Sequence, residues 1–360
     1  MKNINIQIEK SNTLPGTFYY SNEAFENVKI KIFEKTWQFI DSSCNYKLEN
    51  FAKPFVFLKE FIDEPIFLIN NEKKNINCFS NVCTHRGNIL LESPTVIKNN
   101  IICGYHGKQF NTCGEFSFMP KTEGMLNFPS NDDHLSSIDL SMWNKFIFVS
   151  LEPIIPFNLV IEDMSKRISW MPIEDFNLRK DLSKEYFIDA NWALYCDNYL
   201  EGFHIPFIHN DLNEALDFNN YDVELFKYSN LQIGIGKTGE DCFDLPSTSK
   251  DYGKNIAAYY FWLFPNMMFN FYPWGLSINI VKPISPTKTK VEFLSYVWKE
   301  EKMNIGAGAD INKVELEDEE IVQKVQNGVK SRYYKNGRFS PSMEKGVHHF
   351  HLLIKEFLLK

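Results

Sequence analysis

Hydrophobic side chains recur along this chain with two different periods, and the change of period divides it into segments. Residues 16–37 carry apolar side chains at helical spacing, namely Phe25, Val28, Ile32 and Phe33, with Trp37 at the end. This spacing predicts a helix that leads into a first strand. Short apolar or alternating runs separated by turn residues follow at residues 55–58, 66–69, 101–103 and 146–151. They predict a small antiparallel β domain over residues 38–152.

The second half of the chain combines helices with longer strands. Pro153 and Pro156 mark the expected boundary, because proline interrupts regular structure. Helical patterns are expected at residues 180–218, 311–334 and 346–359, and strand-like runs at 257–264, 267–272, 277–283 and 291–298. Strands followed by a long covering helix predict an α+β domain over residues 153–360. Residues 1–37 are expected to form a helical segment that packs on this domain.

Composition and charge exclude several classes of function. A chain of 360 residues with 44% apolar side chains is long enough for two domains and is not disordered. Its net charge of −8 argues against nucleic acid or an anionic membrane as a partner, since both select clustered Lys and Arg. No apolar run approaches the roughly 20 residues that cross a bilayer, and the N-terminus lacks the apolar core of a signal peptide. We therefore expect a cytoplasmic protein. The seven cysteines also favour this location, because an odd number suits a reducing compartment.

Two short cysteine-histidine pairs carry the most specific chemical signal. Cys83 and His85 form the first pair in CTHRG, and Cys103 and His106 form the second in CGYHGKQF. Two thiolates and two imidazoles are the ligands of a Rieske [2Fe–2S] centre, in which histidines replace cysteines on one iron. A zinc site uses the same donors, but it usually groups its cysteines in one pair and its histidines in the other. The mixed pairs therefore predict a Rieske cluster and electron transfer.

A second motif, DNYLEGFHIPFIH at residues 197–209, indicates which kind of Rieske protein this is. With the cysteine-histidine pairs, it resembles the oxygenase (α) component of a Rieske non-haem iron oxygenase. Mononuclear iron(II) that activates oxygen is commonly held by two histidines and one carboxylate, with other positions open. The resemblance assigns His204 and His209 as the two histidine ligands.

The carboxylate ligand is expected on a late acidic helix. In the family, this helix begins with an acidic pair and carries a glutamine two turns later, and Glu317-Asp318 followed by Gln326 resembles that arrangement. Asp318 is the ligand that the resemblance favours, with Asp310 and Glu317 as alternatives. The neighbouring acids are also typical of a solvated helix face, so that interpretation stays open at this point.

Three more residues of the motif receive supporting roles from the resemblance. Glu201 precedes His204 by three residues, where family members place an acid that bridges a cluster histidine of one subunit to an iron ligand of the next. Most relatives have Asp there, and Glu is shared by some oxygenases that act on quaternary amines. A carboxylate of either length can hydrogen-bond two imidazoles. Asn198 and Asp197 are expected to support the iron site.

The resemblance covers nearly the whole chain, so it also implies fold, cofactors and partners. Residues 38–152 would be the Rieske domain and residues 153–360 a helix-grip catalytic domain, with residues 1–37 packed on the latter. Electrons would come from NAD(P)H through a flavin or iron-sulfur reductase or a ferredoxin, and O2 would be the co-substrate. A homotrimer is expected, because the two metal sites of one chain would be too far apart for efficient transfer. A monomer with both sites close together is the alternative.

Two substrate classes remain open. The motif wording is closer to choline monooxygenase-like enzymes acting on choline, betaine or carnitine than to naphthalene-type dioxygenases. A monooxygenase of a small quaternary or methylated amine is thus the leading hypothesis. Hydroxylation or O-demethylation of an aromatic compound is the alternative, and an electron carrier without oxygenase activity is the hypothesis from another class. A buried acid near the cavity would favour the amine, and a wholly apolar pocket would favour the ring.

Aromatic side chains bear on the same choice. They crowd residues 259–274, and together with Tyr199, Phe203 and Phe207 they could form a cage for a quaternary ammonium. Cation–π attraction contributes about 0.5 to 2 kcal/mol per ring. The same side chains are also expected in an ordinary strand core, because aromatics favour strands and alternate between faces.

Overall fold

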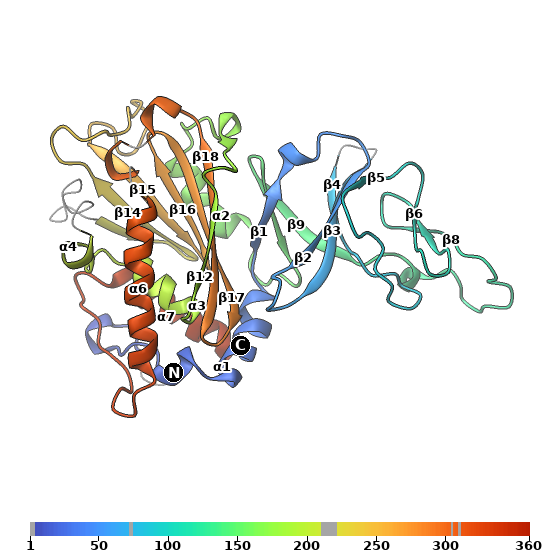
Figure 1. Ribbon diagram of the computed structural model, residues 1–360, viewed down its shortest axis with the longest axis horizontal. Helices are drawn as coiled ribbons and strands as arrows, with labels where there is room; N and C mark the ends of the chain where they lie inside the picture. Colours follow the sequence, from blue (N-terminus) through green and yellow to red (C-terminus); the bar gives the residue numbers. More distant parts are fainter. Residues whose placement is uncertain (1–3, 72–74, 210–221, 304, 309–310) are drawn as a thin grey trace. The chain divides into compact units, whose positions relative to one another are not determined.

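The computed structural model describes residues 4–71, 75–209, 222–303, 305–308 and 311–360 (Figure 1). It divides into two compact units, Glu34–Ile154 on the one hand and Met1–Phe33 with Ile155–Lys360 on the other. Antiparallel sheets occur in both units, and long helices occur in the second. The expected α+β class is therefore confirmed. The N-terminal helical segment belongs to the second unit, with Leu14 and Phe33 among its buried residues.

Within its described residues, the unit Glu34–Ile154 contains a seven-stranded and a three-stranded sheet. The larger sheet has the order β1-β10-β9-β4-β3-β2-β5, with β1 Gln38–Ser42, β2 Phe51–Phe57, β3 Glu64–Asn70, β4 Ile76–Ser80, β5 Thr95–Val96, β9 Ser137–Trp143 and β10 Phe146–Ser150. The smaller one comprises β6 Ile101–Ile102, β7 Gln109–Phe110 and β8 Phe116–Phe118. Phe67 and Phe79 of the larger sheet belong to the same buried cluster as Cys83 and Cys103. The core of this unit therefore extends to the cysteines of both pairs.

The second unit is built on an eight-stranded antiparallel sheet, counted over the described residues. Its order is β11-β18-β17-β16-β15-β14-β13, with β12 also paired to β18. The strands are β11 Asn177–Leu178, β12 Lys184–Ile188, β13 Asp222–Leu225, β14 Ser229–Ile235, β15 Ile256–Leu263, β16 Met267–Tyr272, β17 Gly275–Ser285 and β18 Lys288–Val297. Buried side chains fill β14 to β17 along most of their length. This sheet supports the helices that carry the candidate site.

Three helices lie together on one side of this sheet, α3 Trp192–Tyr199, α6 Ile311–Val329 and α7 Lys345–Leu359 (Figure 1). Trp192 is fully buried and makes edge-to-face contacts with Phe33 and Phe350, at ring centroid distances of 5.0 and 5.6 Å. One tryptophan thus joins the N-terminal segment, α3 and α7. The shorter helices are α1 Asn22–Val28, the π-helical η3 Lys29–Phe33, α2 Asn158–Arg167, α4 Ile205–Ile208, η1 Ile8–Lys10, η2 Gly16–Tyr19, η4 Ser43–Asn45, η5 Asn131–Asp133, η6 Ile173–Asp175, η8 Glu300–Lys302 and η9 Gly306–Gly308.

The structure differs from the sequence-based elements at one place that matters for the sheet. The helix expected from residue 180 is wrong at its start, because residues 184–188 form β12. This strand pairs antiparallel with β18, with Lys184 opposite Phe293. Pairing with a neighbouring strand overrides local preference. Residues 210–218 of the same expected segment lie outside the described residues.

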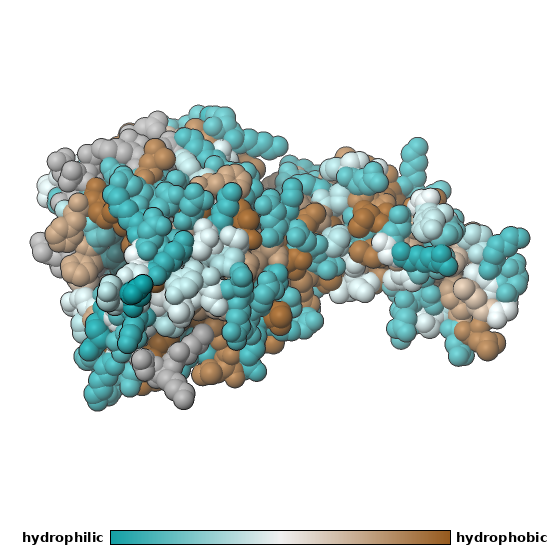
Figure 2. Space-filling model, turned by 60° about the horizontal axis from the view of Figure 1, so that its bottom comes forward, coloured by the Kyte–Doolittle hydropathy of each residue, from teal (hydrophilic) through white to brown (hydrophobic). Residues whose placement is uncertain are grey.

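On the face seen in Figure 2, hydrophilic side chains predominate and hydrophobic ones are scattered between them. In the described part of the chain, no helix has the length and hydropathy required to cross a membrane.

Candidate metal centres

Two loops of the same backbone design hold the cysteine-histidine pairs. In the first, the amide of Gly87 donates to the carbonyl of Cys83 at 3.0 Å, and in the second the amide of Gly107 donates to Cys103 at the same distance. Both glycines have a φ near +70°, a backbone conformation that glycine adopts without steric cost. The repeated turn explains why each pair needs a glycine shortly after its histidine.

The four side chains converge between these loops. Cys83 and Cys103 are buried, and the rings of His85 and His106 lie 4.7 Å apart between centroids. The Nδ1 atom of His106 is buried without a hydrogen-bond partner among the described residues. An unpartnered buried nitrogen is costly unless another atom binds it, so these donors fit a [2Fe–2S] cluster. Asn88, which the sequence did not single out, lies with its Nδ2 3.7 Å from the Cys103 sulfur.

The second centre forms where α3, α4 and α6 meet. Helix α4 has only four residues, and His204 and His209 stand at its two ends, while Asp318 comes from α6. One donor atom from each of the three residues lies within 4.8 Å of the others. Oδ1 of Asp318 is 2.9 Å from His209 Nε2 and 3.5 Å from His204 Nε2. The three residues assigned by resemblance are therefore brought together.

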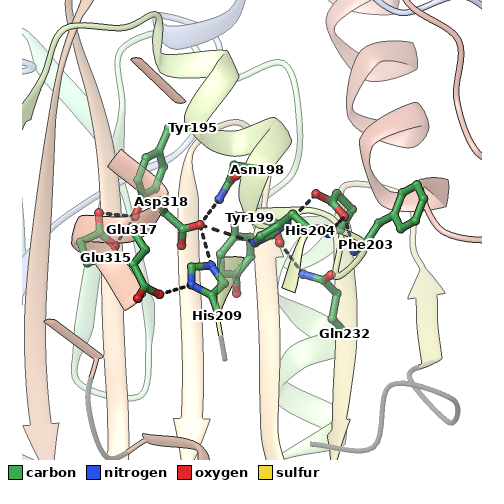
Figure 3. A network of polar contacts seen from close by, with 11 residues as sticks. Tyr195, Asn198, Tyr199, Phe203, His204, His209, Gln232, Glu315, Glu317 and Asp318 are labelled. Carbon is green, nitrogen blue, oxygen red and sulfur yellow. Dashed lines mark hydrogen bonds and ion pairs between the residues drawn. The ribbon is translucent and has the colours of Figure 1, made fainter. Parts of the chain in front are cut away.

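Each of these three residues is held by a further polar side chain (Figure 3). Glu201 Oε1 lies 2.6 Å from His204 Nδ1, and Glu317 Oε2 lies 2.7 Å from His209 Nδ1. A metal-binding histidine usually donates its other ring N–H to a carboxylate, which leaves Nε2 free for the metal. Two imidazoles held in this way, together with the carboxylate of Asp318, fit mononuclear iron(II).

Glu317 and Asp310 were the alternative carboxylates. Glu317 contacts the outer nitrogen of His209 rather than the nitrogen that faces Asp318. Its position therefore favours a role in orienting His209. Asp310 lies outside the described residues.

Charge at this centre is strongly unbalanced. Burial would lower the pKa of His204, but its hydrogen bonds to the carboxylates of Asp318 and Glu201 raise it to about 9. Burial raises the pKa of Asp318, and the two histidines outweigh this effect and lower it. The carboxylates thus stabilise positive charge at the point where the Nε2 atoms meet, which is the position a metal cation would take.

Asp197 and Asn198 have different surroundings although they are adjacent. Asn198 donates from Nδ2 to Asp318 Oδ1 at 2.6 Å. Asp197 instead accepts hydrogen bonds from Tyr19, at 2.8 Å, and from His351, at 2.8 Å. We therefore place Asn198 at the candidate iron site, whereas Asp197 ties α3 to the N-terminal segment and α7.

A cavity opens beside the candidate iron site. The described residues that line it come from α3, α4, α6, η9 and five strands of the sheet: Tyr195, Asn198, Tyr199, Glu201, His204, Ile205, His209, Gln232, Tyr260, Asn270, Tyr272, Asn279, Phe293, Ala307, Val314, Glu315 and Asp318. Sequence reasoning missed several of them, notably Tyr195, Asn270 and Glu315. Tyr195 and Asn270 sit in buried stretches whose pattern alone does not tell which side faces a cavity, and Glu315 lies among acidic residues that also suit a solvated helix face.

Strand alternation sorts the aromatic side chains. Tyr260 and Tyr272 line the cavity, whereas Tyr259 and Phe261 do not and are buried in the core. Phe207, considered for an aromatic cage from the sequence, is 79% exposed and is absent from the lining. The cavity therefore receives part of the aromatic run, and the rest is strand core.

Comparison with known proteins assigns both units to families. The model described as the ring hydroxylating alpha subunit (catalytic domain) matches residues 173–359, and the Rieske [2Fe-2S] domain model matches residues 36–129. The chain is 29% identical over 367 residues to choline monooxygenase, chloroplastic, from Arabidopsis thaliana, covering 97% of this chain and 83% of that protein. It is 30% identical over 365 residues to the carnitine monooxygenase oxygenase subunit of Escherichia coli (strain K12), covering 96% and 93%.

A solved structure supports the assignment at the level of fold. It is the structure of a quaternary ammonium Rieske monooxygenase, and it is described as revealing insights into carnitine oxidation by gut microbiota and inter-subunit electron transfer. It matches with a TM-score of 0.76 at 24% identity, over 96% of this chain and 95% of that chain. With the paired cysteine-histidine loops and the second metal centre in place, the chain belongs to the Rieske-type ring-hydroxylating oxygenase α subunits, a family of oxidoreductases.

Proposed function

We propose that this chain monooxygenates a small quaternary or methylated amine, such as choline, a betaine or a carnitine-like compound. The observation that carries the proposal is Glu315, a carboxylate 5% exposed that lines the cavity beside the candidate iron site. The relatives named for choline and carnitine belong to the same substrate class.

Among the residues that the structure describes, Glu315 has no cationic side chain as a partner. Its two carboxylate oxygens lie 2.8 and 2.7 Å from the Tyr195 hydroxyl, and none of the described Lys, Arg or His residues forms an ion pair with it. A buried carboxylate without a cation is costly to ionise, and burial raises the pKa of Glu315 well above its ordinary value. A cationic substrate in the cavity favours the ionised form and supplies the missing partner.

Tyrosine rings complete the environment for a cation. Tyr260 and Tyr272 are 5.9 Å apart between ring centroids and edge to face, and both line the cavity. Such rings attract an alkylammonium group without requiring a hydrogen-bond donor from it. Neutral polar groups also line the cavity, and among them the Tyr199 hydroxyl donates to Asn270 Oδ1 at 2.6 Å.

The residues of the two centres would bind the cofactors and orient the iron ligands. When bound, a Rieske cluster supplies electrons singly and a mononuclear iron supplies the place where O2 reacts. Cys83, His85, Cys103 and His106 would hold the cluster, and His204, His209 and Asp318 the iron. Glu201, Glu317 and Asn198 orient the iron ligands, and the cavity orients the carbon to be hydroxylated. Hydroxylation of an N-methyl carbon yields a carbinolamine that loses formaldehyde, whereas attack beside the alcohol of choline yields an aldehyde hydrate.

Aromatic ring oxidation remains the second candidate, and the cavity lining argues against it. Its described residues include Asn270, Asn279, Gln232 and Glu315 in addition to the metal-facing groups. A purely apolar substrate would bury these polar side chains against a surface that offers them no polar contact, which is unfavourable. A pure electron carrier would need no second metal centre, whereas three donor residues of the right types are gathered here.

The assembly and partners are also part of the proposal. His85 and His106 are only partly buried, and Phe203, next to His204, is 45% exposed. Both centres thus have a side open to another protein surface. We place the cluster of one subunit against the iron of the next in a homotrimer, with Glu201 as the bridge, and a flavin or iron-sulfur reductase or ferredoxin delivering electrons from NAD(P)H. The seven cysteines are all free, which favours a reducing, cytoplasmic location.

A single turnover tests the substrate class. Protein loaded with both metals and chemically reduced is mixed with O2 and a panel of methylated amines and aromatic acids, and the products are read by mass spectrometry. Formaldehyde with loss of a methyl group, or an aldehyde from choline, is expected. Oxygenated rings with the amines unchanged would overturn the proposal. Native mass spectrometry of the same preparation tests the trimer separately.

A further inference from the structure

A buried lysine stands beside the second cysteine-histidine loop. Lys108 follows His106 by two residues, and its side chain is 1% exposed. Lysine is almost never fully buried unless it is paired, and here Nζ donates to Asp133 Oδ1 at 2.9 Å. The ammonium also lies 5.5 to 5.8 Å from the ring centroids of Phe110, Phe116 and Phe128. Its charge is therefore held in an apolar surrounding, where it acts with little screening.

The ion pair is connected to both loops that would hold the cluster. The amide of Cys103 donates to the carbonyl of Lys108 at 2.8 Å. Thr84, which stands between Cys83 and His85, donates from its hydroxyl to the carbonyl of Asp133 at 3.0 Å. Lys108 and Asp133 therefore keep a constant position relative to both pairs of ligands.

The buried charge lies next to the ligand loops. Lys108 follows His106 by two residues and its carbonyl accepts from the Cys103 amide, while the carbonyl of its ion-pair partner Asp133 accepts from Thr84. A positive charge in an apolar surrounding favours the addition of an electron to a neighbouring centre, because the electron makes that centre more negative.

We propose that Lys108 raises the reduction potential of the Rieske cluster, and that Asp133 positions Lys108 and limits this effect. Reduction adds one electron to the centre beside the buried ammonium. The positive charge of the ammonium stabilises this reduced form. Rieske potentials vary with net charge, burial and hydrogen bonds around the sulfurs. Lys108 is thus a positioning residue for electron entry. The inference rests on the cluster between the cysteine-histidine loops and is independent of the substrate.

The alternative is that the Lys108–Asp133 ion pair has a purely structural role. It predicts that removing either partner loosens the same loops and exposes the cluster, so both variants would shift the potential in the same direction. An electrostatic role predicts opposite signs. Removing the ammonium lowers the potential, and removing the Asp133 charge leaves the ammonium uncompensated and raises it.

The test is the midpoint potential of the cluster in the full-length, cluster-loaded protein, by redox titration followed by visible circular dichroism. The variants are Lys108→Met, Lys108→Arg and Asp133→Asn, with Lys98→Met as a matched removal of a solvent-exposed lysine in the same unit. We expect a lower potential for Lys108→Met, a higher one for Asp133→Asn, and values near the parent for Lys108→Arg and Lys98→Met.

Electron paramagnetic resonance of the reduced proteins shows whether the cluster is intact in each variant. A Lys108→Met potential equal to or above that of the parent would overturn the inference, as would a lower potential in Asp133→Asn. If Lys108→Met does not assemble a cluster, Asp133→Asn still decides the sign, because the backbone carbonyl that binds Thr84 is unchanged in it.

Discussion

Asn198 Nδ2 donates a 2.6 Å hydrogen bond to Asp318 Oδ1, the same oxygen that faces the Nε2 atoms of both histidines. The two residues are far apart in sequence and belong to α3 and α6, which pack against each other. The bond therefore fixes the carboxylate of one helix from the other and orients it toward the candidate metal position.

Replacement of Asn198 by Ala should weaken iron binding without removing a ligand. Loss of a group that orients a metal ligand typically lowers metal affinity by about 10- to 100-fold. We expect that loss at the mononuclear site, measured by competition with a chelator, and an unchanged Rieske spectrum. Asn177→Ala, which removes an exposed amide, is the control. An iron affinity equal to that of the parent protein would contradict the assigned role.

Asp318 and Glu317 should respond differently to neutralisation. Asp318→Asn removes the carboxylate that faces both histidines, so the protein should hold about two irons instead of about three and lose turnover. Glu317→Gln changes only the partner of His209 Nδ1, and it should keep the iron at lower affinity. Iron analysis of both variants decides between the two residues. The reverse pattern would make Glu317 the ligand.

Glu315 should make the stability of the folded chain depend on pH. Burial, and to a smaller extent Asp318, raise its pKa well above the ordinary value, so the folded protein keeps a proton that the unfolded chain has already lost. Stability then falls as pH rises above about 4.3, the ordinary carboxyl pKa.

The matching variant is Glu315→Gln, which removes this dependence. Without mononuclear iron, it should be more stable than the parent protein at pH 8, and the difference should shrink at pH 5. Thermal unfolding at both pH values measures this. Glu301→Gln, at an exposed position, should show no such trend. A Glu315→Gln protein that is less stable than the parent at pH 8 would contradict the assignment.

The charge of the cavity should select among amines. Its described lining contains Glu201, Glu315 and Asp318 but neither Lys nor Arg, and like charges placed together cost several kcal/mol. Choline, which carries only a positive charge, should therefore react with a kcat/KM about tenfold or more above that of glycine betaine, which adds a carboxylate. Steady-state kinetics with both compounds measure the ratio. A preference for glycine betaine would leave the amine class intact but refute this account of the charge.

Trp192 should be a costly core position to truncate, because it joins helices of the second unit. Trp192→Ala removes a fully buried side chain that contacts Phe33 and Phe350. Such changes cost about 3 to 5 kcal/mol in unfolding free energy. Urea denaturation measures the loss, and Tyr333→Ala, at a position 89% exposed, serves as the control. A loss below about 1 kcal/mol would show that this contact does not hold the helices together.

Much of this protein follows from local sequence. The cysteine-histidine pairs, the glycines after them and the strand and helix periods are all readable from short stretches, because a tight loop places its own side chains within a few bonds of one another. His204 and His209 were assigned as ligands by the resemblance of the motif that contains them, and the fold class belongs to the part that local patterns indicate. So does the strand run that contains Tyr260 and Tyr272.

Only tertiary structure decided the roles on the acidic helix. The resemblance favoured Asp318 as the ligand, with Glu317 among the alternatives, but the acidic residues of this helix were also consistent with a solvated face, since a helix pattern does not tell which neighbours it meets. Packing of α6 against α3 turns Glu315 and Asp318 to the cavity and leaves Glu317 against His209. The same applies to the Lys108–Asp133 pair, which joins residues from different loops. Contacts between distant segments arise only when the core closes, so no local rule could assign them.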